Sequence, residues 1–284
     1  MSDQQRPEQS QDPPGTTAEM SPQPRDGMAD YEGRDLLTGR KALITGGDSG
    51  IGRAVAIAFA KEGADVAIAY LDEHDDARHT AKLVEAAGQR AVLIPGDLSE
   101  EEACRHAVAT TVDDLGGIDI LVNNIAQQRP VESLGEVTTE EWDATFRTNV
   151  YSYFWCTQAA LEHMPDGGAI INSGSVNGLR GNKSLLAYAA TKGAVHIFTK
   201  SMAQALLDRG IRVNCVAPGP VWTPLIPATM PAEKTAAFGS QDPMDRAAQP
   251  DEIAPSYVFL ASERLSGFYT GQVLSPIGGE THPG

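Results

Sequence analysis

Tyr188 and Lys192 are the most informative pair in this 284-residue chain, because their spacing suits proton transfer. On a helix, residues four apart lie on one face with Cβ atoms about 5–6 Å apart, so the Lys192 ammonium is expected beside the Tyr188 phenol. A nearby positive charge favours the phenolate and lowers the phenol pKa from its ordinary value of about 10. Such a phenol can act as a general acid or base near neutral pH. Ser175 and Asn149 lie upstream as further polar candidates.

This pair alone is weak evidence, because Tyr and Lys at this spacing also occur on exposed helices, where both side chains reach into solvent. A glycine-rich turn, TGGDSGIG from Thr45 to Gly52, strengthens it. The turn follows an apolar run and enters an Ala-rich helical pattern, which is typical of a loop that holds a pyrophosphate. Glycine permits the tight turn and the close approach of backbone N–H groups, while the helix N-terminus contributes its dipole. The sequence therefore predicts a nucleotide cofactor near Tyr188.

Together with later landmarks in a characteristic order, these motifs make the chain resemble the short-chain dehydrogenase/reductase family from about Leu37 to the C-terminus. The resemblance rests on Thr45 to Gly52, Asp97-Leu98, Asn123 to Ala126, Asn149, Ser175, Tyr188 with Lys192, Pro218-Gly219 and Thr223. Within the family, the chain is similar to a bacterial subgroup with a polar, Pro-containing N-terminal extension and the TGGDSGIG loop. The resemblance implies a single-domain Rossmann fold and NAD(P)-dependent interconversion of alcohols and ketones or aldehydes.

The resemblance also implies roles for individual residues. Tyr188 transfers the proton, Ser175 binds the substrate oxygen, Lys192 binds the nicotinamide ribose, and Asn149 holds a helix kink and a water for proton exchange. The implied cofactor-binding residues are Thr45, Gly46, Asp48, Ser49, Gly50, Ile51, Gly52, Tyr70, Leu71, Asp97, Leu98, Asn123, Ile125, Ala126, Tyr188, Lys192, Pro218, Gly219, Val221 and Thr223. Ile125 and Ala126 stand where the family usually has Ala and Gly, so we expect a narrower nicotinamide pocket.

The choice between NAD and NADP should depend on the end of the second predicted strand. An acidic residue there binds the ribose 2′-OH of NAD, and a basic residue accommodates the 2′-phosphate of NADP, but Tyr70 is neither. Asp48 and Asp72 make an additional phosphate less favourable, although Arg53 can offset them. The expected cofactor is therefore NAD(P)(H), with NAD favoured.

Apolar runs alternate with helix-like segments from Lys41 onward, which is typical of a parallel sheet covered by helices on both faces. The predicted strands are 41–45, 65–70, 91–95, 118–123, 169–173, 211–216 and 272–275. Ligands of such sheets bind at the carboxyl ends of the strands, which is where the motifs fall. We therefore expect an α/β, doubly wound parallel sheet of about seven strands in one Rossmann domain.

Two segments flank or interrupt this pattern. Residues 1–36 form a polar, Pro-rich extension ahead of the catalytic domain at 37–284, and their prolines exclude regular helix. The extension is either a disordered tail or an arm across the domain or a neighbouring subunit, with Met20, Met28 and Tyr31 as its apolar anchors.

Residues 220–247 follow the sixth predicted strand and are rich in Pro and Ala. We expect them to form a mobile substrate lid, and the alternative is an ordinary surface insertion. Trp222, Met230, Phe238 and Met244 favour an apolar substrate pocket.

Bulk properties limit partners and location. A net charge of −16 argues against binding to nucleic acid or anionic membranes. No apolar run approaches the roughly 20 residues that span a bilayer, and no signal peptide is recognised, so a cytoplasmic protein is expected. Cys104, Cys156 and Cys215 are widely separated and are predicted to be reduced core thiols. The histidines lack metal-ligand spacing, so no metal is expected.

The helical segments 140–164 and 184–207 are apolar around much of their circumference, and such faces favour partners. The resemblance implies that they pack between subunits of a homotetramer.

Rival functions are a cofactor-binding regulator or scaffold with little turnover, a sugar-nucleotide epimerase and a serine hydrolase. The intact Ser175, Tyr188 and Lys192 set argues against the first. The glycine spacing, the lack of an additional C-terminal domain and the missing GxSxG motif argue against the others.

Overall fold

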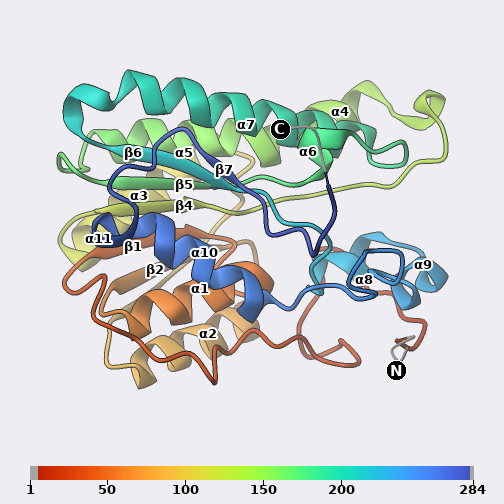
Figure 1. Cartoon of the computed structure of the whole chain (residues 1–284), viewed down its shortest axis with the longest axis horizontal. Helices are drawn as coiled ribbons and strands as arrows, with labels where there is room; N and C mark the ends of the chain where they lie inside the picture. The colour runs from red at the N-terminus through yellow and green to blue at the C-terminus, as the bar shows by residue number, and fades with distance from the viewer. Residues whose placement is uncertain (1–5, 282–284) are drawn as a thin grey trace.

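A seven-stranded sheet in the order β3-β2-β1-β4-β5-β6-β7 forms the centre of the computed structural model, which describes residues 6–281 (Figure 1). All six strand pairings are parallel. The strands are β1 Lys41–Thr45, β2 Asp65–Tyr70, β3 Ala91–Pro95, β4 Ile120–Asn123, β5 Ala169–Ser173, β6 Arg212–Val216 and β7 Val273–Leu274. The predicted fold is therefore confirmed, and the last two strands and β4 are shorter than expected.

Helices cover both faces of the sheet (Figure 1). On one face lie α1 Gly50–Lys61, α2 His74–Ala86 and α10 Pro250–Ala261, and on the other lie α3 Glu101–Leu115, α5 Ser152–Leu161 and α7 Leu186–Ala205. Because both faces are covered, strands such as β1 and β5 are buried along nearly their whole length, which requires continuous apolar runs rather than alternation. Cys104, Cys156 and Cys215 are free and buried in these layers, as predicted.

Shorter elements complete the chain. They are η1 Leu134–Glu136, α4 Thr139–Phe146, η2 Arg147–Tyr151, α6 Asn177–Arg180, η3 Leu207–Arg209, α8 Leu225–Thr229, α9 Ala232–Ala236 and α11 Glu263–Ser266. The segment predicted as one helix at 140–164 is thus α4, a π-helical turn η2 and α5. A capping box formed by Thr138 and Glu141 starts α4, because their side chains satisfy backbone N–H groups that the helix leaves unpaired.

Residues 6–36, called the arm below, are irregular in structure and run along one side of the domain from α8 and α9 to the end of α1 (Figure 1). Met20 and Met28 are 4% and 2% exposed, so two of the three expected anchors are buried, and the third, Tyr31, is partly buried. The Tyr31 hydroxyl donates to the Glu62 side chain, and Lys61 Nζ donates to the Met28 carbonyl at 2.7 Å. The described part of the extension is therefore an arm on its own domain rather than a disordered tail.

No helix of residues 6–281 is both long and apolar enough to cross a bilayer.

Candidate active site

A cavity of about 1150 Å³ lies along the carboxyl ends of the strands, where the order reverses between β1 and β4. The predicted residues on its wall are Gly46, Asp48, Ser49, Gly50, Ile51, Tyr70, Leu71, Asp97, Leu98, Ile125, Ala126, Ser175, Tyr188, Lys192, Pro218, Gly219, Val221 and Thr223. Segments far apart in the sequence thus converge because parallel strands end at the same edge of the sheet.

The phosphate loop, Gly46 to Gly52, has the geometry that an anion site requires. Gly46 and Gly50 have φ values of +64° and +53°, which favour glycine. Ser49, the residue before α1, makes no side-chain cap, while Gly50 and Ile51 line the cavity. The first N–H groups of this 12-residue helix are therefore available to a phosphate, together with the positive end of its dipole.

Two glycines of this loop must stay close to each other. A Cβ on Gly52 would lie 1.8 Å from the Gly46 carbonyl oxygen. Gly52 is not on the cavity wall, and its lack of a side chain lets α1 pack closely against the turn.

Thr45 was also expected at the cofactor, but it lies behind the cavity wall and is 1% exposed. Its hydroxyl oxygen accepts from the backbone N–H of Asn124 at 2.8 Å. The Asn124 side-chain amide in turn donates to the Gly46 carbonyl at 3.1 Å. Asn124 lines the cavity and was not predicted to touch the cofactor, although its adjacency to Asn123 was a signal.

Asn123, also predicted at the cofactor, is fully buried inside the sheet and does not line the cavity. Its side-chain amide donates to Thr157 Oγ1 at 3.2 Å and to Asn172 Oδ1 at 2.9 Å. Successive strand residues point to opposite sides, so a one-residue difference separates a fully buried amide from one that lines the cavity.

Tyr188 lies on α7 at the cavity wall with Ser175 beside it. Burial raises the pKa of Tyr188 above its ordinary value, although a hydrogen bond with Ser175 acts in the opposite direction. Lys192 Nζ lies 5.6 Å from the centre of the Tyr188 ring. The net shift is therefore upward rather than downward, because burial outweighs the hydrogen bond with Ser175.

Lys192 is 1% exposed, and its ammonium reaches the end of β5. Its ammonium donates to the Ser173 carbonyl at 2.7 Å and to the Tyr153 hydroxyl at 3.3 Å. Burial lowers the pKa of Lys192 to about 8, because a charged group is disfavoured in apolar surroundings. Tyr153 was not among the predicted site residues; the cluster of aromatic residues around it was the only signal.

Asn149 is fully buried within η2 and does not line the cavity. Its Oδ1 accepts from the Gln127 N–H at 2.8 Å, and its Nδ2 donates to the Gln127 carbonyl at 2.9 Å and to Thr191 Oγ1 at 3.1 Å. A π-helical turn interrupts the regular helix here, so the expected irregularity is present. Asn149 thereby joins the loop after β4 to the residue preceding Lys192.

At the end of β2 the cavity is acidic. Burial raises the pKa of Asp48 to about 7 and also raises the pKa of Glu73. Glu73 lines the cavity, and its Oε1 is buried without a hydrogen-bond partner in the described part of the chain. A free carboxylate oxygen fits a hydroxyl-bearing group such as the adenosine ribose. Glu73 was missed because it lies three residues beyond Tyr70, at the start of α2.

Arg53 does not offset this charge in the way the sequence allowed. It is 1% exposed and pairs with Asp26 at 3.1 Å and Asp76 at 2.6 Å. The guanidinium is therefore occupied by protein carboxylates.

The segment after β6 contributes α8 and part of the cavity wall, including Met230 and Phe238. Trp222 does not line the cavity but is fully buried in a separate cluster with Met20 of the arm. Met244 is 58% exposed. The apolar character expected of the substrate pocket thus comes from two of the four large residues.

Within residues 6–281, no group of three or more His, Cys, Asp or Glu is placed to hold a metal ion.

The class of protein is that of a nicotinamide-dependent oxidoreductase. It is defined by the doubly wound parallel sheet, by the glycine-rich turn before an open helix N-terminus, and by the Tyr–Lys pair in the same cavity. Residues 46–281 match the family model described as Enoyl-(Acyl carrier protein) reductase. The chain belongs to the short-chain dehydrogenase/reductase family.

Relatives agree with this class. The chain is 55% identical to General stress protein 39 of Bacillus subtilis, over 94% of this chain and 93% of that protein. It is 48% identical to NADPH-dependent aldehyde reductase 1, chloroplastic, of Arabidopsis thaliana, over 94% of each. A short chain dehydrogenase from Burkholderia cenocepacia, crystallised in complex with NADP, is 35% identical with a TM-score of 0.80, covering 86% of this chain and 98% of that one. The protein is therefore an enzyme that performs NAD(P)-dependent oxidoreduction.

The preference for NAD is not supported. The Arabidopsis relative is named for NADPH, and the Burkholderia enzyme is bound to NADP. The preference rested on the negative charge of Asp48 and Asp72, and burial raises the pKa of Asp48 to about 7, so that its carboxyl is partly protonated at neutral pH. The prediction of a nicotinamide cofactor is therefore supported, but the preference for NAD over NADP is not.

Proposed function

We propose that this enzyme interconverts an alcohol and an aldehyde or ketone, with Tyr188 as the general acid and base. The observation that supports this proposal most strongly is that Tyr188, Ser175 and Lys192 line the same cavity, together with residues of α8. One turn of α7 holds Tyr188 and Lys192, and Ser175 lies two residues after β5, so their relative positions are set before a substrate enters.

The roles follow from the chemistry of each group. A bound cofactor supplies or accepts the hydride. In reduction, the Ser175 and Tyr188 hydroxyls donate hydrogen bonds to the substrate carbonyl oxygen, and Tyr188 transfers its proton to that oxygen as the carbon is reduced. The raised pKa keeps the phenol protonated and suits this direction. Lys192, one helical turn away, stabilises the phenolate that remains, and in oxidation the proton moves back.

The cofactor-binding residues form two groups in this proposal. The adenosine half lies near Asp48, Tyr70, Leu71, Glu73, Asp97 and Leu98, and the nicotinamide half lies near Ile125, Ala126, Lys192, Pro218, Gly219, Val221 and Thr223. Thr45, Gly52, Asn123 and Asn149 act behind the wall by holding those loops in place.

Aldehydes are the first substrate class to examine, because a relative 48% identical to this chain is named as an aldehyde reductase. The wall near Tyr188 combines apolar and polar side chains, including Leu185, Gln127 and Asn177. Such a wall fits a small carbonyl compound that carries polar groups. An enoyl thioester belongs in the same panel, because the matched family model is described as an enoyl reductase.

The test compares Tyr188→Phe with Tyr269→Phe, a change at a 45% exposed tyrosine outside the cavity. NADPH and NADH absorbance is followed with an aldehyde and ketone panel. Loss of the dissociable proton should lower kcat by about 10²–10⁴-fold in Tyr188→Phe, with cofactor affinity nearly unchanged, while the control keeps full activity. Near-normal turnover by Tyr188→Phe, or reduction of the enoyl thioester alone, would rule out the proposal.

We also propose that the enzyme assembles as a homotetramer, as the family resemblance implies. Tyr151 of η2, Phe154 of α5 and Ile197 of α7 are 39%, 47% and 61% exposed, which leaves apolar surface on these helices. A homotetramer would bury them. Light scattering should report a tetramer that Phe154→Glu dissociates and Leu134→Glu, at an exposed residue of η1, does not. A monomeric wild-type protein at micromolar concentration contradicts this.

Three broader assignments belong to the proposal. Residues 37–284 are the catalytic domain with 220–247 as the lid, residues 1–36 are the extension, and the extension with TGGDSGIG marks a bacterial subgroup. A cytoplasmic location is supported by the net charge of −16 and three free thiols. Limited proteolysis with and without cofactor tests the lid, since closure should protect it, and fractionation of cells tests the location.

A further inference from the structure

We propose that the arm is a working part of the cofactor site: it positions the phosphate loop through the buried Arg53, with Asp26 as the arm's contribution. This inference rests on the proposed placement of the cofactor pyrophosphate at that loop.

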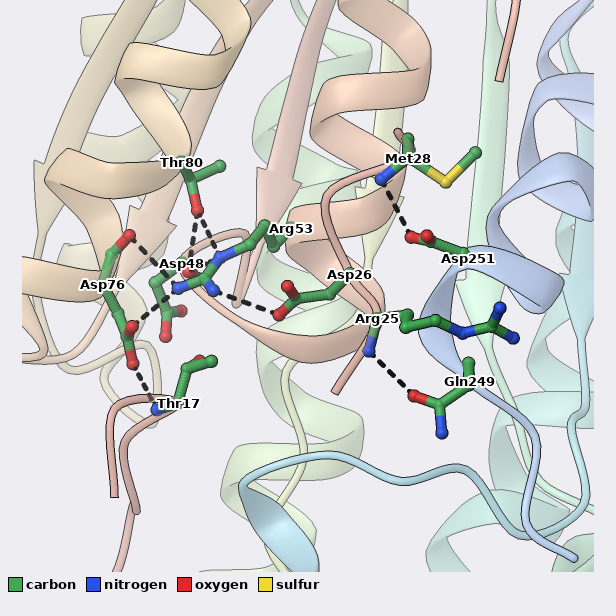
Figure 2. A network of polar contacts seen from close by, with 10 residues as sticks. All are labelled: Thr17, Arg25, Asp26, Met28, Asp48, Arg53, Asp76, Thr80, Gln249 and Asp251. Atoms are coloured by element: carbon green, nitrogen blue, oxygen red, sulfur yellow. Dashed lines mark hydrogen bonds and ion pairs between the residues drawn. The ribbon is translucent and has the colours of Figure 1, made fainter. Parts of the chain in front are cut away.

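Arg53 connects three segments (Figure 2). Its Nη1 donates to Asp26 Oδ2 of the arm at 3.1 Å, and its Nη2 donates to Asp76 Oδ1 of α2 at 2.6 Å. Its Nε donates to the Asp48 carbonyl, within the phosphate loop, at 2.9 Å and to Thr80 Oγ1 at 3.0 Å. One side chain thus holds the loop with one edge and the arm with another.

The charges explain why the arm matters to this arrangement. Arg53 is 1% exposed, and a buried guanidinium is stable only when its donors are paired. Asp26 and Asp76 lie on opposite sides of the fork, so both carboxylates determine its orientation. Without Asp26 the guanidinium is free to turn toward Asp76, and its Nε then moves away from the Asp48 carbonyl.

A second connection passes through Asp76. The Thr17 N–H of the arm donates to Asp76 Oδ2 at 2.8 Å, while Asp76 Oδ1 binds Arg53. Thr80 Oγ1 on the same helix donates to the Asp48 carbonyl at 2.7 Å. The arm therefore supplies one of the two carboxylates around Arg53, Asp26, and holds the other, Asp76, through the Thr17 hydrogen bond.

The arm is held in place on both sides of Asp26. On α10 and the residue before it, Asp251 Oδ1 accepts from the Met28 N–H at 3.0 Å and Gln249 Oε1 accepts from the Arg25 N–H at 2.8 Å (Figure 2). These contacts flank Asp26 in the sequence. They place its carboxylate at Arg53 without requiring the Arg53 contact itself.

The arm also reaches the other wall of the cavity. Pro13, Pro14 and Gly15 line the cavity. A Cβ on Gly15 would lie 2.9 Å from Ala228 Cβ of α8, so the arm packs tightly against the proposed lid. The Gln11 N–H donates to the Pro227 carbonyl at 2.9 Å. Residues 11–26 therefore span from the lid to the phosphate loop.

Three further contacts join the arm to the proposed lid. The Arg6 guanidinium lies 4.2 Å from the Trp222 ring centre, and its Nη1 donates to the Phe238 carbonyl at 2.8 Å. Trp222 Nε1 donates to the Pro22 carbonyl at 2.8 Å. The arm contacts both the phosphate loop and the proposed lid. A ligand that orders the phosphate loop should therefore also order the arm, and an ordered arm should in turn favour ligand binding.

The decisive variant is Asp26→Asn, which removes the charge and keeps the size. Asp12→Asn is the matched control, since Asp12 is an exposed aspartate of the same arm. ADP-ribose is the probe, because it carries the pyrophosphate and adenosine but no nicotinamide, and calorimetry measures its Kd. Asp26→Asn should raise this Kd about tenfold, as expected for the loss of one well-placed charge-assisted contact, and raise KM for the cofactor with kcat nearly unchanged. The control should match the wild type.

Arg53→Lys provides an independent variant, because it keeps the charge but lacks the fork that reaches the Asp48 carbonyl and both carboxylates. It should also weaken ADP-ribose. In the wild type, ADP-ribose should slow hydrogen exchange at residues 16–28, which a purely stabilising role of the arm would not cause. Wild-type Kd values in folded Asp26→Asn and Arg53→Lys, with unchanged exchange in the arm, overturn the inference. A wild-type protein that binds neither ADP-ribose nor a dinucleotide instead removes the proposed cofactor site on which it rests.

Discussion

The Lys192 ammonium donates a hydrogen bond to the main-chain carbonyl oxygen of Ser173 at 2.7 Å. This contact ties the middle of α7 to the last residue of β5, two residues before Ser175. The ammonium also lies 5.3 Å and 5.6 Å from the ring centres of Tyr153 and Tyr188. The cation is thus placed among aromatic rings and one carbonyl, at the wall where the nicotinamide ribose is proposed to bind.

Replacing this cation should weaken the cofactor. Lys192→Met keeps the length of the side chain and removes its donors, so the Kd for NADPH should rise on the order of tenfold and kcat should fall as well. Lys200→Met, at an exposed residue of the same helix, is the control and should change neither. Fluorescence titration measures the Kd, and an unchanged value would contradict the ribose contact.

The end of β5 is also held from the opposite face of the sheet. The Tyr257 hydroxyl of α10 lies 2.6 Å from Ser173 Oγ, which donates to Asn124 Oδ1 at 3.0 Å. Tyr257→Phe leaves this buried serine with one partner fewer, so the free energy of unfolding should fall by about 1–3 kcal/mol. Urea denaturation measures it, with Tyr269→Phe as the exposed control. Equal stability of the two variants would show that the contact contributes nothing.

Gly52 gives a prediction about close packing. A Cβ there would lie 1.8 Å from the Gly46 carbonyl oxygen, so Gly52→Ala must push α1 away from the turn. We expect a loss of about 3 kcal/mol in stability together with much weaker binding of ADP-ribose. Gly135→Ala is the control, because a Cβ there meets only Ser133 Oγ at 3.9 Å. A Gly52→Ala protein with wild-type stability and affinity would show that close packing at Gly52 is not required.

The raised pKa of Asp48 leads us to expect that NADP⁺ binding depends on pH. Burial raises its pKa to about 7, so the carboxyl is mostly neutral at pH 6 and mostly charged at pH 8. The negative charge that appears as the pH rises lies near the proposed adenosine half of the cofactor, which carries the 2′-phosphate in NADP⁺, so the Kd for NADP⁺ should increase about three- to tenfold over this range.

Asp48→Asn isolates this effect, because it removes the titrating group and leaves the ionisation of the phosphate itself unchanged. Calorimetry at pH 6, 7 and 8 should show a steeper rise for the wild type than for the variant. Parallel curves would mean that Asp48 does not face the phosphate.

Much of the architecture was visible in the sequence. Buried parallel strands require continuous apolar runs, so the runs at 41–45, 65–70 and 169–173 match β1, β2 and β5 residue for residue. The glycine-rich turn and the Tyr188–Lys192 spacing are also local patterns. The parallel sheet then explains why residues from six different loops reach one cavity.

Whatever depended on burial or on distant partners required the tertiary structure. The pKa of Tyr188 rises because the fold buries it, although its helical neighbour is a lysine. Asn123 and Asn124 are adjacent and chemically identical, yet only the second reaches the cavity. Arg53 meets its carboxylates 27 and 23 residues away, and no local periodicity encodes such pairs. The sequence alone determined which elements form and which motifs end them. Only the packed chain decided which charges are buried, which groups pair with them and that the arm lies beside the cavity.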